Sequence, residues 1–447
     1  MPSWLKPGTA FLLLALVFGS AFLALLPPFQ APDEPFHLLR AYQISTGQWG
    51  ETLEDGRRGA VVPASAIDFF SAFQHVPLKP AAKVSKEEIL GFRERPLEPK
   101  ATRFIGYATA LAHPAWPYLP QALGMGLARA LELPTFYLLY LGRLFNLLAW
   151  AALVYAAIRR TPILPWLLFL LALTPISLQQ AASLSPDAVT NGLAFLLFAG
   201  LLRLWLAPEE VPAPAALVGT MALGLLLTLS KFAYGLHALL FLLIPWQRFG
   251  SRGRRLLGMA IFLGLNLAWM LHTLCSGGDP ARAGGEGRFL ALLQDPVHFF
   301  EVGLDTIRVY GLFYLEQFVG RLGHLDTNLP RALIVYYWLL LMGVALLERE
   351  PGRGLKPAER AWIAGVLLAE VAAIWMGLLL TYNPEGAELI RGGQGRYLIP
   401  LAPFFFLLLY RPAAGAGSRR WIALVCVYSA AMALTVALFS LTRRFYG

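Results

Sequence analysis

Charged residues are scarce in this chain of 447 residues, where Asp, Glu, Lys and Arg together make up only 14%. Soluble globular domains carry about 25% charged residues, so this composition excludes an ordinary soluble fold. Hydrophobic residues make up 57%, and apolar runs long enough to cross about 30 Å of hydrocarbon recur along nearly the whole length. Such runs must be helical because backbone groups in lipid need internal hydrogen-bond partners. The sequence therefore predicts an all-α integral membrane protein.

Cysteine is almost absent as well. Cys275 and Cys426 are the only two, and both lie in apolar segments without a paired or metal-like spacing, which predicts packing roles. The net charge of +10 raises the question of nucleic-acid binding. However, the Lys and Arg residues lie in short connections between apolar runs and not on one basic face, so we expect no nucleic-acid partner.

About eleven membrane spans are expected in a single transmembrane domain that covers residues 1–447. The first apolar run follows Lys6 and shares a basic start with signal peptides, but it is long and no clear small-residue cleavage site precedes Pro27 and Pro28. We therefore interpret it as an uncleaved span. The expected spans lie near residues 9–28, 136–158, 163–182, 187–206, 213–230, 232–247, 256–275, 331–347, 359–381, 396–410 and 420–441.

Residues 116–131 are apolar enough for a short span but carry Pro117, Pro120 and Arg129. If they lie flat on the membrane, nearly all Lys and Arg clusters of the short connections fall on one side together with Lys6. That side is then cytoplasmic by the positive-inside rule. We therefore expect an interfacial helix at this position.

Two large segments then lie on the outer side, residues 29–135 after the first span and residues 276–330 after the seventh. They hold most of the non-helical polar sequence. The second segment opens with a glycine-rich stretch from Gly277 to Gly287, a composition that is typical of a loop.

The first candidate for chemistry is the acidic pair Asp33 and Glu34, which His37 and Arg40 follow within one turn-to-helix stretch. Asp33 is suited to cap the helix that Pro35 begins, with both acids favoured by the helix dipole. The competing interpretation is that one carboxylate acts as a general base in a cleft at the membrane surface. The spacing alone favours neither interpretation.

Further polar side chains are expected on the same side, at the ends of apolar runs. A charge at the bilayer centre costs about 3 kcal/mol, so such residues are candidates for function. The alternatives are that Arg143 and Lys231 extend to the interface and that Asp187 caps a helix. This group comprises Arg143, Asn146, Gln179, Gln180, Asp187, Asn191 and Lys231.

A glycine-rich turn, Gly392 to Gly395, precedes Arg396 and Tyr397 at the start of the tenth expected span. A planar guanidinium beside backbone N–H groups is well suited to a phosphate, although glycine here could also serve only to permit a tight turn. Topology places Arg143, Lys231 and Arg396 on the side that holds the acidic pair. That convergence predicts one shared site.

Several short stretches together resemble a bacterial family of multi-pass membrane proteins of unassigned function that is grouped with the GT-C superfamily of membrane glycosyltransferases. They are Pro32 to Ala41, Tyr118 to Gly124, Arg143 to Asn146, Leu173 to Pro175, Ser185 to Asp187, Leu229 to Phe232, Gly320 to Thr327 and Gln394 to Tyr397. The resemblance covers almost the whole chain. It departs from the family pattern at His324, where Trp is frequent, and at His113–Pro114 with Pro117, where a doubled proline is usual.

The resemblance implies a GT-C-like bundle with interfacial helices in the first outer segment, a catalytic base at Asp33, supported by Glu34, and a polyprenyl-phosphate sugar as donor. The expected reaction is inverting glycosyl transfer to an envelope glycan, lipid or protein, on the outer face of the bacterial cytoplasmic membrane. A second hypothesis is a lipid or polysaccharide-precursor transporter or flippase, and a third is an envelope scaffold. Asp33 and Glu34 could bind a divalent cation, but the number of cations makes a metal dispensable, and we expect no cofactor.

These expectations assign a role to each candidate residue. Binding of the donor phosphate is expected from Arg143, Lys231, Arg396 and Tyr397, and binding of other parts of the substrates from His37, Arg40, Gln180 and Asp187.

Overall fold

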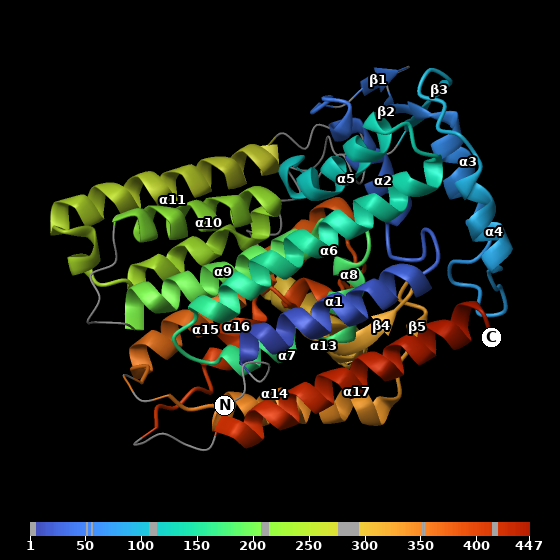
Figure 1. The fold of residues 1–447 in the computed structure, drawn as a ribbon. Coiled ribbons are helices and arrows are strands. Elements are labelled where there is room, and N and C mark those ends of the chain that lie inside the picture. The colour runs from blue at the N-terminus through green and yellow to red at the C-terminus, as the bar shows by residue number, and fades with distance from the viewer. Residues whose placement is uncertain are drawn as a thin grey trace.

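The computed structural model describes residues 6–50, 52–54, 57–106, 114–206, 214–275, 295–350, 352, 354–413 and 419–447. Most of its helices run along one direction and form an elongated bundle (Figure 1). Six of the described helices are long and apolar enough to cross a membrane, which confirms a multi-pass membrane protein. They are α1 (Pro7–Leu25), α6 (Thr135–Arg160), α9 (Asp187–Leu206), α11 (Arg252–Cys275), α15 (Pro357–Thr381) and α17 (Arg419–Phe445).

Three further apolar helices are shorter, namely α10 (Pro214–Ser230), the 3-10 helix η4 (Phe232–Leu243) and α14 (Arg331–Leu347). Residue 213, where one expected span begins, lies outside the described residues. A short 3-10 helix, η5 (Trp246–Phe249), follows η4. The total of eleven spans therefore stays a prediction.

Two expected spans are broken in the structure. Residues 163–182 form α7 (Pro165–Ala172) and α8 (Pro175–Ala181), and residues 396–410 hold η7 (Gly395–Leu398) and α16 (Ala402–Leu407). Proline explains the first break because it cannot donate a backbone hydrogen bond within a helix, and Thr174 caps the new helix by accepting from the Ser177 N–H at 3.3 Å. Each break provides additional helix termini, where backbone N–H groups lack intrahelical partners.

The 29–135 segment gathers at one end of the bundle (Figure 1). Its helices are α2 (Glu34–Ser45), α3 (Ala64–Ala72), α4 (Lys86–Leu90), η2 (Gly91–Arg93), η3 (Trp116–Tyr118) and α5 (Leu119–Ala130). It also contains an antiparallel sheet that we did not predict, with β1 (Thr52–Glu54), β2 (Arg57–Pro63) and β3 (Thr102–Gly106) in that order.

A cluster of aromatic rings packs this segment together. Phe29 contacts Phe69 edge to face, with ring centroids 5.0 Å apart, and Phe69 lies 4.4 Å from Phe92. Phe29 is the residue that follows the two prolines after α1, and its φ of 64° turns the chain toward α2. The aromatic cluster therefore fixes the path by which the chain leaves α1 and reaches Asp33.

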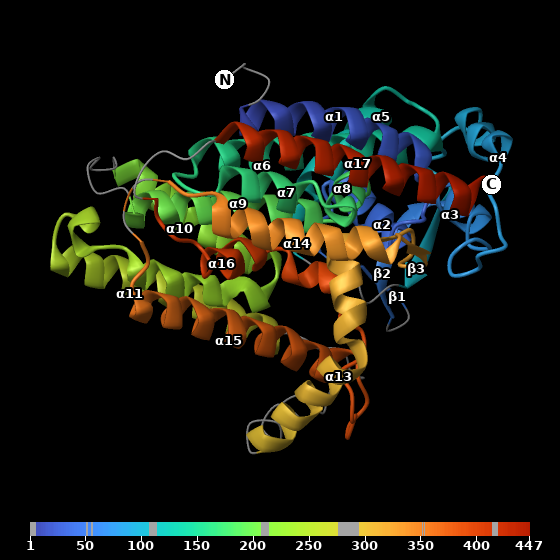
Figure 2. The same ribbon diagram turned by 90° about the horizontal axis from the view of Figure 1, so that it is seen from below.

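The second large segment, residues 276–330, is mostly helical where it is described. Its glycine-rich opening, Gly277 to Gly287, lies outside the described residues. Contrary to the expectation of non-helical sequence, residues 296–320 form the long helix α13 (Pro296–Gly320), which departs from the direction of the bundle (Figure 2). A small hairpin, β4 (Arg321–Leu322) with β5 (Thr327–Asn328), follows it.

The C-terminal end of α17 is fastened to both large segments. The Val84 N–H donates to the Phe445 carbonyl at 2.9 Å, and Arg444 forms an ion pair of 2.9 Å with Asp326 of the β4–β5 hairpin. Arg444 also donates to the carbonyls of Val76 and Ala82. The C-terminus therefore lies at the end of the bundle that carries the 29–135 segment (Figures 1 and 2).

Candidate functional site

Asp33 stands directly before α2, at the position of an N-cap, but it does not cap the helix. Its backbone is left-handed, with φ 59° and ψ 8°, and its side chain accepts no capping hydrogen bond. A left-handed backbone is uncommon for residues other than glycine, although Asp and Asn are enriched there. The side chain is 59% exposed and lies 3.7 Å from the Arg396 guanidinium. The carboxylate is therefore directed to Arg396 and available to a ligand.

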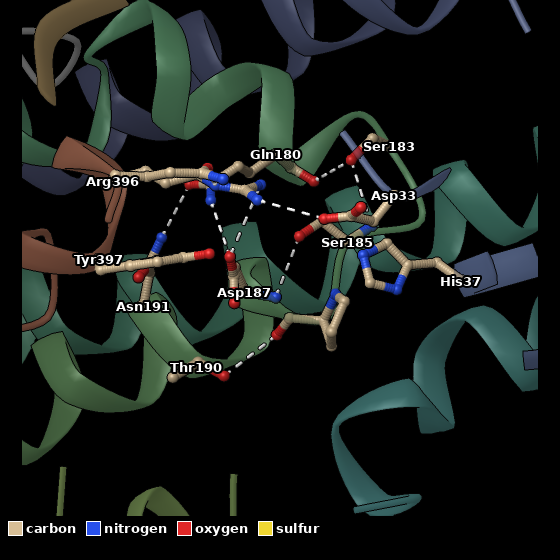
Figure 3. Close-up of polar contacts among 12 residues, drawn as sticks. Asp33, His37, Gln180, Ser183, Ser185, Asp187, Thr190, Asn191, Arg396 and Tyr397 are labelled. Atoms are coloured by element: carbon tan, nitrogen blue, oxygen red, sulfur yellow. Dashed lines mark hydrogen bonds and ion pairs between the residues drawn. The ribbon is translucent and has the colours of Figure 1, made fainter. Parts of the chain in front are cut away.

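Arg396 is held by the glycine-rich turn before it. The Gly395 N–H donates to the Gln317 side chain of α13 at 2.7 Å, and the Arg396 Nε donates to Gln394 Oε1 at 2.5 Å. The Arg396 side chain is only 4% exposed. Figure 3 shows its guanidinium between the carboxylates of Asp33 and Asp187, and the distance to Asp187 is 3.8 Å. The turn thus delivers a buried cation to two acids that lie far apart in the sequence.

Asp187 begins α9 and connects Arg396 to a second cation. Lys231, which precedes η4, places its Nζ 2.5 Å from Asp187 Oδ1 and 4.8 Å from the centroid of the Tyr397 ring. The Gln180 amide donates to Asp187 Oδ2 at 3.2 Å and accepts from Asn191 at the same distance. The structure therefore brings together five predicted site residues beside Asp33: Gln180, Asp187, Lys231, Arg396 and Tyr397.

The charges of this cluster balance. Two cations, Lys231 and Arg396, face two carboxylates, Asp33 and Asp187, and three of the four side chains are 22% exposed or less. In such a partly desolvated place the attraction between the cations and an anion is stronger than in water because the effective dielectric constant is lower, and the repulsion by the carboxylates is stronger as well. The arrangement can hold a phosphate against the cations while the exposed carboxylate of Asp33 accepts a proton.

Glu34 and Arg143 form a separate, fully buried ion pair. Both side chains have 0% exposure, and the guanidinium donates to the two carboxylate oxygens at 2.8 and 2.6 Å. Arg143 also donates to the carbonyls of Leu26 and Pro27, and Glu34 accepts from the Leu184 N–H at 3.1 Å. Asp33 and Glu34 thus point to different cations, and the two carboxylates do not converge on one metal ion.

The side chains that follow on α2 have different surroundings. The His37 side chain places its Nδ1 2.8 Å from the Tyr118 hydroxyl of η3. The backbone N–H of His37 donates to the Asp33 carbonyl at 3.0 Å. Arg40 is directed toward its own segment, where it donates to the Gln43 side chain at 2.7 Å and to the Trp49 carbonyl at 3.0 Å. His37 therefore joins α2 to η3, and Arg40 closes the turn after α2.

One imidazole near the site was not predicted as a site residue. His324 lies in the turn of the β4–β5 hairpin, which Gln179 of α8 holds by hydrogen bonds to the N–H and the carbonyl of Gly323 at 2.8 and 3.0 Å. Burial lowers the pKa of His324 below its usual value, although the nearby carboxylates of Asp33 and Asp326 act in the opposite direction. The only sequence signal was its departure from the family pattern.

The comparison with protein families supplies an independent result. A family model described as "Predicted membrane protein (DUF2142)" matches residues 16–405. The chain belongs to this family. No curated protein and no solved structure matches it. Membership of DUF2142 agrees with the helical architecture, and it leaves the chemistry to be argued from the site.

Proposed function

We propose that this DUF2142 protein is an inverting glycosyltransferase of the GT-C type that takes its sugar from a polyprenyl phosphate. The observation that carries the proposal is the placement of Asp33, a partly exposed carboxylate that does not cap its helix and lies 3.7 Å from a buried arginine. Inverting transfer from a phosphate-linked donor is helped by a base for the acceptor hydroxyl and by positive charge for the leaving phosphate, and Asp33 and Arg396 would supply both. If Asp33 served only to cap α2, an arginine beside its carboxylate would not be needed.

In this mechanism Asp33 removes the proton from an acceptor hydroxyl while the hydroxyl oxygen attacks C1 of the donor sugar. The bond between C1 and the phosphate oxygen breaks, and the electron pair leaves with the polyprenyl phosphate. Attack opposite the leaving group inverts the configuration at C1. Arg396 and Lys231 stabilise the negative charge that grows on the phosphate in the transition state, which is where such interactions accelerate a reaction.

The contacts of four other predicted residues fall into two groups. Tyr397 contacts Lys231 through its ring, and Gln180 orients Asp187, so both support the cations that receive the phosphate. Glu34 and Arg143 are satisfied by one another and by backbone groups. We therefore reassign them from catalysis and phosphate binding to holding the turn that presents Asp33.

The proposed setting is the outer face of the bacterial cytoplasmic membrane. When the broken segments α7–α8 and η7–α16 and the three shorter apolar helices are counted with the six long helices, the chain crosses eleven times. The N-terminus is then cytoplasmic and the site lies outside, where polyprenyl-linked sugars are used to modify a glycan, lipid or protein of the envelope. Apolar side chains of the bundle would hold the lipid tail.

The test is the replacement Asp33→Asn, which keeps the shape of the side chain and removes its basicity. The expected result is a fall in transfer from a polyprenyl-phosphate sugar by a factor of about 10²–10⁴, the usual range for losing a general base. The measurement is product formation by protein reconstituted in lipid vesicles. Asp305→Asn is the matched control because that carboxylate is 52% exposed on α13 and pairs with Arg308. Unchanged transfer by the Asp33→Asn variant would rule out the assignment of the base.

A transporter or flippase is the second candidate, and one observation favours it. His237 of η4 and Glu370 of α15 form a buried pair near the middle of their elements, with side chains 1% and 0% exposed. Intramembrane ionisable residues are common in proton-coupled transport. The remaining polar residues of the site gather at one end of the bundle, as transfer chemistry requires. Movement of a fluorescent polyprenyl phosphate across a vesicle bilayer, without any transfer, would establish the transporter instead.

A further inference from the structure

The His237–Glu370 pair lies at one end of a row of polar residues along η4. Lys231, Tyr234 and His237 follow one another at intervals of three. Lys231 is the residue directly before η4, and its backbone is extended, with φ −148° and ψ 120°. Tyr234 and His237 lie within η4, where side chains three residues apart share a face. Lys231 contacts Asp187, the Tyr234 hydroxyl donates to the Tyr397 carbonyl at 3.0 Å, and His237 contacts Glu370. One face of η4 is therefore connected to the site at one end and to α15 at the other.

The secondary structure of η4 is unusual and needs support from its neighbours. It has 3-10 geometry over the 12 residues Phe232–Leu243, whereas 3-10 runs rarely exceed about four residues because their hydrogen bonds are poorer. An α-helix rises about 1.5 Å per residue and a 3-10 helix about 2.0 Å. Over the five steps from Phe232, the first residue of η4, to His237 the difference is about 2.5 Å. A change to α-helix would also rotate the polar row off its face.

The His237–Glu370 pair is buried and closely packed. Both side chains are buried, and the rings of Tyr234 and Phe404 lie 6.4 and 5.3 Å from the His237 ring. Among the described residues, no group forms a hydrogen bond with His237 Nε2 or Glu370 Oε2. Removing only one member would leave the other without its partner in a place of low dielectric constant, which is costly.

The geometry points to His237 and Glu370 as a positioning pair that holds η4 in its 3-10 form and thereby sets the depth of Lys231 at the phosphate site. This inference rests on the proposed function for the meaning of the site, but the placement of Lys231 can be tested without it. The pair touches neither reactant. It acts through Lys231 and Tyr234.

The variant that tests the inference is His237→Leu with Glu370→Leu. Replacing both members of a buried pair by apolar residues is often neutral or stabilising, so this double variant is expected to fold. The matched control is Glu370→Gln, which keeps a hydrogen-bonding partner for His237. Thermal unfolding in detergent establishes that each variant is folded. If the double variant does not fold, Glu370→Leu alone takes its place, since no buried carboxylate then remains at this position.

The first measurement is the labelling rate of Lys231 by an amine-reactive reagent, followed by mass spectrometry, with exposed Lys79 as the internal reference. The wild type and Glu370→Gln should protect Lys231 equally because its ion pair with Asp187 is kept. The double variant should label at least fivefold faster, because a shift of about 2.5 Å breaks the ion pair of 2.5 Å between Lys231 and Asp187. Equal labelling of the double variant and the wild type would overturn the inference.

The second measurement is the dissociation constant for a polyprenyl monophosphate. The double variant should bind it about tenfold more weakly, and adding Lys231→Met should weaken binding no further than Lys231→Met alone, because both changes remove the same contact. Fully additive losses would overturn the inference. If the wild type does not bind this lipid, the proposed function fails, and the labelling result still decides the positioning role. If Glu370→Gln labels like the double variant, a hydrogen-bonded partner for His237 does not hold Lys231 in place, and the inference is overturned.

Discussion

At the scale of single residues, two neighbouring acids have different surroundings. Asp33 and Glu34 are adjacent in the sequence, yet Asp33 is 59% exposed beside Arg396 whereas Glu34 has 0% exposure beside Arg143. The left-handed backbone of Asp33 separates them, because it turns its side chain away from the start of α2. Such a backbone costs on the order of 1 kcal/mol or more and persists only where the surroundings impose it. The buried pair next to it is the constraint that does so.

The Glu34–Arg143 pair leads to a prediction about stability. Arg143→Met leaves the Glu34 carboxylate buried without its partner, so the free energy of unfolding should fall by about 3–5 kcal/mol. Arg143→Met combined with Glu34→Leu should be clearly more stable than Arg143→Met alone, because no unpaired charge remains. Thermal unfolding in detergent measures both. The prediction is wrong if the double variant is as unstable as the single one, which would assign the loss to the Arg143 bonds with Leu26 and Pro27.

At the scale of elements, the short turn before Arg396 is packed tightly against α13. A side chain at Gly395 would overlap the Tyr314 carbonyl and approach the Phe318 N–H within 2.8 Å. Both are backbone groups of a helix and cannot move aside cheaply. The close approach, and not conformational freedom, is the reason for glycine at this position, because η7 begins there without a positive φ.

We predict that Gly395→Ala displaces Arg396 and reduces transfer by at least tenfold. The unfolding temperature should fall less than in the Arg143→Met variant. Gly365→Ala is the control, since a Cβ there meets nothing within 4 Å and alanine is the better helix former in α15. Transfer in vesicles and thermal unfolding are measured for both. Normal transfer by the Gly395→Ala variant would show that the depth of Arg396 is not set by this turn.

At the scale of the whole molecule, the C-terminus is joined to the segments around the site. Lys83 donates to the carbonyls of Arg443 and Arg444, both at 3.0 Å, and Arg444 pairs with Asp326. These contacts require the end of α17 to lie on the same side of the membrane as the 29–135 segment. An odd number of crossings from a cytoplasmic N-terminus also places the C-terminus on the side of the 29–135 segment, which follows the first crossing.

This topology can be tested by cysteine accessibility in intact cells, with Cys275 and Cys426 replaced by alanine. A cysteine introduced at Gly447 should react with a membrane-impermeant maleimide added outside, and a cysteine at Lys6 should react only after the cells are opened. A cysteine at Lys100, which is exposed in the 29–135 segment, serves as the positive control for outside labelling. Labelling of position 447 only in opened cells would contradict the eleven-span topology.

The membrane class, and most of the residues that the structure brings together beside Asp33, could be predicted from the sequence because they depend on local composition. Long apolar runs must be helical in lipid, and a charge such as Arg396 or Lys231 at the end of such a run is costly enough to indicate a role. The helix after Asp33 was also predicted, since Pro35 suits a first turn. The breaks in α7–α8 and η7–α16 and the β1–β3 sheet were not, because short elements are decided by their neighbours.

The pairing of charges required the folded chain. Nothing in the order of residues indicates that Arg143 binds Glu34 and Arg396 faces Asp33, or that Glu370 contacts His237, since each pair joins segments far apart in the sequence. Which carboxylate faces which cationic side chain depends on the left-handed backbone of Asp33 and on the 3-10 geometry of η4. Both are held by packing across the bundle, and local propensity favours neither. The acidic pair was visible in the sequence, and the difference between its two members arises from tertiary contacts.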